Sequence, residues 1–254
     1  YIDDELQGEK ETTKASKVLD LFRTNPNQHV KIETWNNMPT AAGLSSSSSG
    51  LSALVKAANE LFQVGKTQSE LAQIAKFASG SSSRSFFGPL AAWDKNSGDV
   101  YQVETDLKLA MIMLVLTDQK KPVSSRDGMK LCTETSTSFP EWIKQSEQDY
   151  EDMLGYLKAN DFQAVGELTE ANALRMHQTT STANPPFSYL TDASYQAMDK
   201  VKALRASGEQ CYFTMDAGPN VKVLCLEEDL DRLAEHFRKD YEVIVSRTKE
   251  LPDA

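Results

Sequence analysis

The sequence predicts an α+β protein with two domains. Its 254 residues are enough for two modest domains, each with a core of its own. Segments with helical spacing and segments with the alternation of strands follow one another without an internal repeat. A nearly all-apolar stretch at 107–116 is typical of a strand covered on both faces. We place the border just before it, which predicts domains at residues 1–105 and 106–254.

The elements of the first domain follow from apolar spacing. Apolar residues three and four apart predict helices near 15–22, 51–62 and 71–78. Thr67-Gln68-Ser69-Glu70 has the spacing of a capping box and should begin the last of these helices. Alternation and turn residues predict short strands at 30–34, 90–93 and 100–103.

The second domain begins with the apolar strand. A loop is expected at 118–128, followed by helices near 140–159, 161–177 and 188–206. Strands are expected at 211–215, 221–226 and 241–245, with a helix at 229–237 before the last strand. This order suggests helices on one face of a mainly antiparallel sheet.

Composition excludes several classes of protein. The 27 basic and 37 acidic residues give a net charge of −10, which disfavours binding to nucleic acid or to anionic membranes. Apolar runs fall well short of the ~20 residues that span a bilayer. Cys132, Cys211 and Cys225 lack the spacing of a metal site or a disulfide framework, which indicates free thiols in a reducing compartment, the cytoplasm. The three histidines also lack metal-ligand spacing, so structural or surface roles are expected.

A loop rich in serine and glycine precedes the helix at 51–62. Residues 37–50 read NMPTAAGLSSSSSG. Unpaired N–H groups at a helix start favour an anion, and Gly43 permits close backbone approach, so phosphate is the expected ligand. A flexible linker is the alternative, but the strand and helix predicted on either side favour a structured loop. The Walker and dinucleotide-binding patterns are absent from it.

The segment PTAAGLSSS at 39–47 resembles the phosphate-binding motif of the GHMP kinase superfamily, in the version carried by mevalonate diphosphate decarboxylases. SGSSSRS at 79–85 and YFTMDAGPNVK at 212–222 are similar to that family at the corresponding places. The resemblance implies a GHMP-type fold with an N-terminal domain related to a ribosomal-protein domain, a C-terminal ferredoxin-like domain and an active site in the cleft between them. The family's Tyr-Trp-Gly-Lys is absent, so we expect Tyr1 to begin inside the first domain.

The same resemblance implies a reaction. Mevalonate 5-diphosphate would be phosphorylated by ATP on its tertiary hydroxyl and decarboxylated to isopentenyl diphosphate, with Mg²⁺ bridging the ATP phosphates and with ADP, phosphate and CO₂ as further products. This reaction belongs to isoprenoid biosynthesis by the mevalonate pathway, and the family implies a homodimer. Two alternatives stay open: a sister kinase, such as phosphomevalonate or homoserine kinase, and a nucleotide-binding module without catalysis.

Site residues also follow from the resemblance. Nucleotide binding is assigned to Pro39, Ala41, Gly43, Leu44, Ser45, Ser46, Ser47, Ser48 and Lys120. Substrate binding is assigned to Ser79, Gly80, Ser81, Arg84, Ser125 and Arg126. Asp216, Arg84 and Ser125 are the expected catalytic residues, and metal ligands are not predicted.

Each assignment has a plainer alternative. Arg84 beside several serines suits bidentate contact with carboxylate or phosphate, but such a residue is often part of a surface ion pair. The cations Lys120, Lys121 and Arg126 fit a solvated loop as well as an anion site. Asp216 lies between two predicted strands, where it could be an ordinary turn residue. In the family the matching Asp faces the substrate hydroxyl, which favours a catalytic carboxylate that takes its proton.

Overall fold

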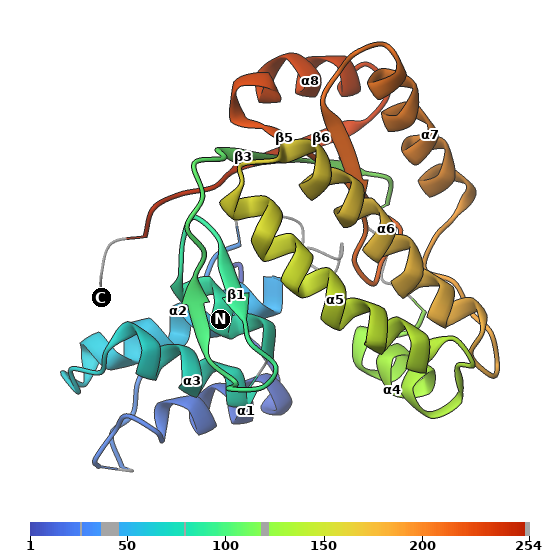
Figure 1. Ribbon diagram of the computed structural model, residues 1–254. Helices are drawn as coiled ribbons and strands as arrows, with labels where there is room; N and C mark the ends of the chain where they lie inside the picture. Colours follow the sequence, from blue (N-terminus) through green and yellow to red (C-terminus); the bar gives the residue numbers. More distant parts are fainter. Residues whose placement is uncertain (26, 37–45, 79, 118–121, 252–254) are drawn as a thin grey trace. The chain divides into compact units, whose positions relative to one another are not determined.

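The structure, a computed structural model, describes residues 1–25, 27–36, 46–78, 80–117 and 122–251. The chain divides into two compact units (Figure 1). The first contains the described residues up to Val103 together with 249–251, and the second contains those from Glu104 to Thr248. Helices and antiparallel strands occur in both units, which confirms the predicted α+β class. The border between residues 105 and 106 stays a prediction about independently folding domains.

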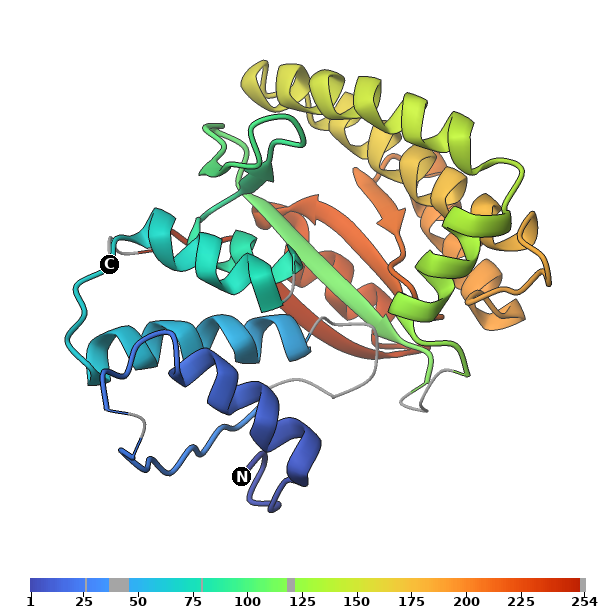
Figure 2. The same cartoon turned by 90° about the horizontal axis from the view of Figure 1, so that it is seen from below.

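The first unit is a layer of helices with a small hairpin. Its elements are α1 (Glu9–Leu19), α2 (Ser46–Leu61), α3 (Gln68–Ala78), a 3₁₀ helix η1 (Gly80–Phe86), β1 (Ala91–Trp93) and β2 (Val100–Gln102). The three α-helices lie side by side (Figure 2) and bury Val18, Val55, Leu71 and Phe86 in a common core. The predicted capping box is confirmed at the start of α3, where the N–H of Thr67 donates to Glu70 Oε2 at 2.8 Å.

The prediction of a strand at 30–34 is wrong. Val30, Ile32 and Thr34 do alternate with exposed residues. Within the described residues, however, regular pairing of this segment is limited to one bridge between Thr34 and Ile2. Alternation reports a half-buried face, whereas a strand also needs a continuous backbone partner. The residues of the segment itself do not indicate whether another strand will pair with it.

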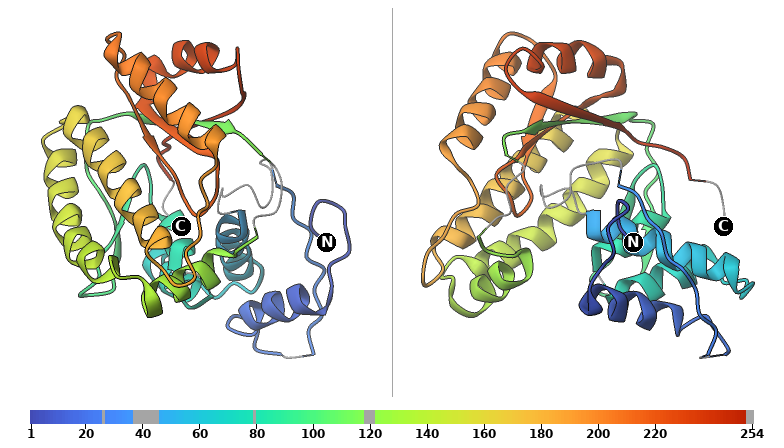
Figure 3. Two further views of the ribbon diagram at one scale, coloured as in Figure 1. Left: turned by 90° about the vertical axis from the view of Figure 1, so that its right-hand side faces the viewer. Right: turned by 180° about the vertical axis from the view of Figure 1, so that it is seen from behind.

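The second unit is built on a four-stranded antiparallel sheet. Its strands are β3 (Leu109–Val115), β4 (Cys211–Thr214), β5 (Val221–Leu226) and β6 (Glu242–Arg247), in the spatial order β4-β5-β3-β6. The helices α7 (Asp192–Ala206) and α8 (Leu230–Phe237) pack against these strands (Figure 3). Ile112, Phe213, Val223, Leu233 and Phe237 form the centre of the core. This order is that of a ferredoxin-like sheet, as predicted.

A pair of long helices lies beside β4. The helices α5 (Phe139–Lys158) and α6 (Phe162–Ser181) run side by side and in opposite directions (Figure 2), with α6 against the strand and α5 packed on α6. Asp149 of α5 is buried and accepts hydrogen bonds from Gln145 at 3.0 Å and from Asn172 of α6 at 2.7 Å. Burial alone would raise the pKa of this carboxyl, but the hydrogen bonds and the Arg175 guanidinium hold it below its ordinary value. The network fixes α6, from which further side chains reach β4.

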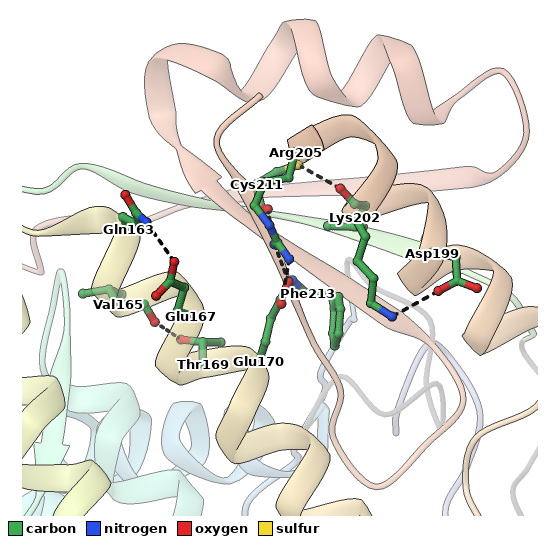
Figure 4. Close-up of polar contacts among 11 residues, drawn as sticks. Gln163, Val165, Glu167, Thr169, Glu170, Asp199, Lys202, Arg205, Cys211 and Phe213 are labelled. Carbon is green, nitrogen blue, oxygen red and sulfur yellow. Dashed lines mark hydrogen bonds and ion pairs between the residues drawn. The ribbon is translucent and has the colours of Figure 1, made fainter. Parts of the chain in front are cut away.

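The free edge of β4 is covered by two side chains (Figure 4). The N–H of Phe213 donates to Glu170 Oε1 at 2.9 Å, and Arg205 donates to the carbonyl of Cys211 at 2.9 Å. Arg205 and Glu170 also form a two-point ion pair at 2.7 and 3.0 Å. An exposed strand edge is open to pairing with other chains, and this pair closes it. It also fixes the strand that leads to Asp216.

Candidate active site

The predicted site residues fall into two groups, one in each unit. Ser48, Gly80, Ser81 and Arg84 belong to the first unit, and Ser125, Arg126 and Asp216 belong to the second. Seven others lie outside the described residues: Pro39, Ala41, Gly43, Leu44, Ser45, Ser79 and Lys120. Ser46 and Ser47 begin α2, but their side chains also lie outside the description. The cleft expected between the domains stays a prediction.

In the first unit, hydroxyl groups join two serine clusters that are about thirty residues apart. The Oγ atoms of Ser48 and Ser81 are 2.6 Å apart. Ser52, one turn further along α2, donates to the carbonyl of Ser82 at 2.8 Å. Ser82 and Ser83 are fully buried in η1. The start of α2 and the segment that leads to Arg84 are therefore held together by side chains that the sequence places far apart.

Gly80 explains how closely η1 lies on the hairpin. A Cβ atom at this position would come within 2.7 Å of the Trp93 ring, so a larger residue would displace the segment. The same ring has Lys76 Nζ 4.9 Å from its centroid, a cation–π distance. Packing of glycine on an anchored tryptophan thus positions the chain just before Arg84.

Arg84 and Arg126 differ from the other arginines. Arginines that pair with a carboxylate are Arg23, Arg175, Arg205, Arg232, Arg238 and Arg247. Arg84 and Arg126 are exposed, and neither forms an ion pair within the part of the chain that is described. The alternative interpretation of Arg84, as part of a surface ion pair, is therefore not supported within the described residues. Two uncompensated guanidinium groups are suited to carboxylate or phosphate oxygens.

The loop expected at 118–128 is wrong at its end, because the helix α4 (Ser125–Thr135) begins inside it. The Ser124 hydroxyl accepts from the N–H of Asp127 at 3.1 Å, which caps the helix. Ser125 and Arg126 thus occupy the first turn, where N–H groups and the helix dipole favour anions. The sequence did carry a signal for this start, since Ser124 and Asp127 have the spacing of a capping pair.

Asp216 lies in the turn between β4 and β5, as predicted. Its carboxylate is exposed and forms an ion pair with Lys222 of β5, whose side chain is largely buried. Lys222 was not among the site residues predicted from the sequence, although a lone Lys within an otherwise apolar strand was a signal for it. The ion pair presents a carboxylate whose position is set by a neighbouring strand.

The rest of the turn is anchored at two points. Asn220 Oδ1 accepts from the N–H groups of Leu116 at 2.7 Å and of Thr117 at 3.1 Å, both at the end of β3. Ser194 of α7 is buried and donates to the carbonyl of Pro219 at 2.6 Å. An exposed carboxylate on a turn with buried anchors has the fixed geometry that proton transfer requires.

Among the described residues, potential metal ligands, cavities and long apolar helices add no further component to this site. Clusters of three or more His, Cys, Asp or Glu that could hold a metal do not occur among them. A cavity of about 730 Å³ in the first unit lies among α1, the segment around Val30 and the Leu51 side of α2, and those candidate residues that the structure describes do not line it. The described helices include none that is long and apolar enough to cross a membrane.

Comparison with known proteins gives two family matches. Residues 1–103 match the diphosphomevalonate decarboxylase-like N-terminal domain. Residues 111–252 match the mevalonate 5-diphosphate decarboxylase C-terminal domain. The two matches agree with the predicted two-domain fold. The chain belongs to the mevalonate 5-diphosphate decarboxylase family.

Individual relatives agree with this assignment. The structure of mevalonate pyrophosphate decarboxylase from Streptococcus pyogenes is 67% identical, with a TM-score of 0.95, and is matched over 100% of this chain and 80% of its own. The complex of MDDEF with MVAPP, AMPPCP and magnesium is 38% identical, with a TM-score of 0.86, over 100% of this chain and 82% of its own. The diphosphomevalonate decarboxylase of Candida albicans is 32% identical over 81% of this chain. The chain spans 60% of the length of that curated relative.

Proposed function

We propose that the protein catalyses the ATP-dependent decarboxylation of mevalonate 5-diphosphate to isopentenyl diphosphate, a step of the mevalonate pathway. The observation that carries this proposal is the pair Arg84 and Arg126, whose charges are not matched by a carboxylate within the described residues. The substrate has a carboxylate and a diphosphate, and exposed guanidinium groups suit both. In a chain with a net charge of −10, such local cations are what an anionic substrate needs.

Asp216 is the proposed catalytic carboxylate. It would take the proton of the tertiary hydroxyl as that oxygen attacks the γ-phosphorus of ATP, and the bond from phosphorus to the ADP oxygen would break. The C–O bond of the new phosphate ester would then break, and phosphate would leave with the electron pair of that bond. The bond between the carboxylate carbon and its neighbouring carbon would break as well, so that CO₂ is released and the electron pair of this bond forms the new double bond. After releasing that proton to water, the ionised Asp216 would stabilise positive charge at the reacting carbon.

The remaining predicted residues have binding roles in this proposal. Arg84 would orient the substrate carboxylate, with Ser79, Gly80 and Ser81 beside it. Ser125 and Arg126 would contact the substrate from the first turn of α4. The residues proposed to bind the phosphates of ATP are Pro39, Ala41, Gly43, Leu44, Ser45, Ser46, Ser47, Ser48 and Lys120. Serine hydroxyls and N–H groups at the start of α2 are suitable donors for them.

Mg²⁺ fits the donors of this proposal. It prefers oxygen ligands and is usually held by phosphates, waters and few protein groups, so a dedicated cluster of carboxylates is not required. When bound, it would neutralise charge on the transferred phosphoryl group. The relative MDDEF has a structure in complex with magnesium and AMPPCP, which supports both ligands.

The decisive experiment measures two products of the full-length protein. With ATP, Mg²⁺ and mevalonate 5-diphosphate, we expect ADP and CO₂ to form in equal amounts. ADP without CO₂ would favour the alternative of a sister kinase, with phosphomevalonate and homoserine as the next substrates to assay. Nucleotide binding without formation of either product would favour a non-catalytic module.

Two further properties belong to this proposal. Cys211 and Cys225 are opposite each other in the register of β4 and β5, and both are free thiols. Unbridged neighbouring cysteines suit a reducing compartment, which supports the cytoplasm as the location. A homodimer is proposed from the family resemblance, and light scattering of the purified protein would measure the mass of the particle.

A further inference from the structure

His177 is a buried polar side chain that the proposed reaction does not use. It lies on α6 and is only 7% exposed, and within the described residues neither of its ring nitrogens has a hydrogen-bonding partner of good geometry. Burial lowers the pKa of this imidazole, while the backbone of Met215 and Asp216, and then the Asp216 carboxylate, act to raise it. The ring therefore lies against the segment that enters the Asp216 turn. A buried imidazole at this place needs an explanation.

The His177 ring also contacts Tyr189. The two ring centroids are 6.4 Å apart and the planes are nearly perpendicular, at 83°. Tyr189 is buried, and its hydroxyl donates to the carbonyl of Ser124 at 3.1 Å. Ser124 is the N-cap of α4. The hydroxyl of Tyr189 thus reaches the residue immediately before Ser125 and Arg126.

The contact between Tyr189 and α4 is tight. A Cβ atom at Gly128 would come within 2.1 Å of the Tyr189 hydroxyl oxygen, so only glycine fits in the first turn at this point. The ring of Phe187 packs edge-on against Tyr189, with centroids 5.3 Å apart. Tyr189 is therefore closely packed between Phe187 and the first turn of α4.

We propose that His177 and Tyr189 are positioning residues, a two-ring bridge that holds the Asp216 turn and the first turn of α4 in a fixed arrangement within the second unit. The bridge rests on the proposed function, because it matters only if Asp216 and the pair Ser125 and Arg126 act on the same substrate. The bridge would affect the reaction through the Asp216 carboxylate at one end and the start of α4 at the other.

Two conservative variants break the bridge at different points. Tyr189→Phe keeps the ring and removes only the hydroxyl that contacts Ser124. His177→Phe keeps an aromatic ring of similar size and removes the polar atoms next to the Asp216 turn. We expect each variant to melt close to the wild-type temperature and to lose kcat by roughly ten- to a hundredfold, because small misplacements of reacting groups have effects of this size. KM for ATP should stay within about twofold, because Ser46, Ser47 and Ser48 at the start of α2, which are proposed to bind the ATP phosphates, belong to the other unit.

Phe162→Leu is the matched control. Phe162 is a buried ring on α6 that packs edge-on against Tyr212, at the end of the helix remote from His177. Its replacement should lower the melting temperature and leave kcat at the wild-type value when assayed well below that temperature. A residue that only fills the core would behave in this way, so the split between melting and kcat separates the two roles.

The double variant tests whether the rings act as one bridge. If they do, His177→Phe with Tyr189→Phe should be about as slow as the slower single variant, because either change already breaks the same link. Effects that multiply, or single variants with wild-type kcat beside an active wild-type protein, would overturn the bridge alone. A full-length wild-type protein that releases no CO₂ would overturn the proposed function, and the bridge with it.

Discussion

Among single residues, the arginines carry the clearest information about function. Arg238, like most arginines of this chain, pairs with a nearby carboxylate, here that of Glu235 at 2.6 Å. The two arginines that the sequence assigned to substrate binding, Arg84 and Arg126, have no such partner in the described part of the chain. Their selection from the sequence depended on family motifs, because spacing alone cannot tell an unpaired arginine from a paired one.

Arg84→Lys should be harmful although it keeps the charge. An ammonium group cannot reproduce a planar two-point contact with a carboxylate, so we expect kcat/KM for mevalonate 5-diphosphate to fall by about ten- to a hundredfold, the equivalent of roughly 1.5–3 kcal/mol for a charged hydrogen bond. Steady-state kinetics of the full-length protein measure this. Arg238→Lys, in a surface ion pair, is the control that should keep wild-type kinetics. Equal kinetics for both variants would return Arg84 to the class of ordinary surface residues.

His177 should make stability depend on pH. Its pKa is lowered by burial from the ordinary 6.5, so the unfolded chain takes up a proton more readily than the folded one. Its contribution is fully present above the ordinary pKa and is lost as the pH falls below it, by at most about 1.4 kcal/mol per pH unit. Urea unfolding from about pH 7.5 to about pH 5.5 should show a smaller loss of stability for His177→Phe than for wild type. Identical slopes would show that the imidazole is not buried in its neutral form.

At the scale of elements, the strands around Asp216 were predictable and the start of α4 was missed. The segment at 107–116 is a nearly continuous apolar run, and the segments at 211–215 and 221–226 carry β-branched and aromatic residues, so β3, β4 and β5 could be predicted. By contrast, α4 has exposed residues at most of its positions, so apolar spacing did not reveal it. The contacts that position the Asp216 turn, from Asn220 and Ser194, join residues far apart in the chain and have no local signature.

The edge of β4 allows a stability prediction. Glu170→Gln should lower the free energy of unfolding by about 1–3 kcal/mol, because it weakens a hydrogen-bonded ion pair and can turn an amide donor toward the N–H of Phe213. Glu167→Gln on the same helix is the control, since Glu167 is exposed and accepts only from Gln163 among the partners drawn in Figure 4. Urea denaturation measures both variants. Equal stability of the two would mean that the Glu170 pair does not support the edge strand.

For the whole molecule, the sequence predicted the fold class and the family more surely than the site. Periodicity marked most helices and strands, and three short motifs indicated the family, which the matches over residues 1–103 and 111–252 bear out. Site residues came from those motifs as single positions. The hydroxyl contact between Ser48 and Ser81 and the ion pair between Asp216 and Lys222 became visible only in the folded chain. Such contacts depend on how distant segments pack together, and the local sequence around each residue carries no information about that packing.

The central claim is that Asp216 is the catalytic carboxylate. Asp216→Asn keeps the shape of the side chain and suits the turn, but it cannot accept the proton of the tertiary hydroxyl or offset positive charge at the reacting carbon. The direct measurement is single-turnover formation of ADP by the full-length protein, with a thermal melt of the same samples. We predict a cooperative melt only a few degrees below that of wild type, because the ion pair with Lys222 is lost, together with nucleotide and substrate binding within a few-fold of normal and a rate lower by about 10²–10⁴-fold. ADP formation at the wild-type rate in a folded Asp216→Asn protein would contradict the mechanism.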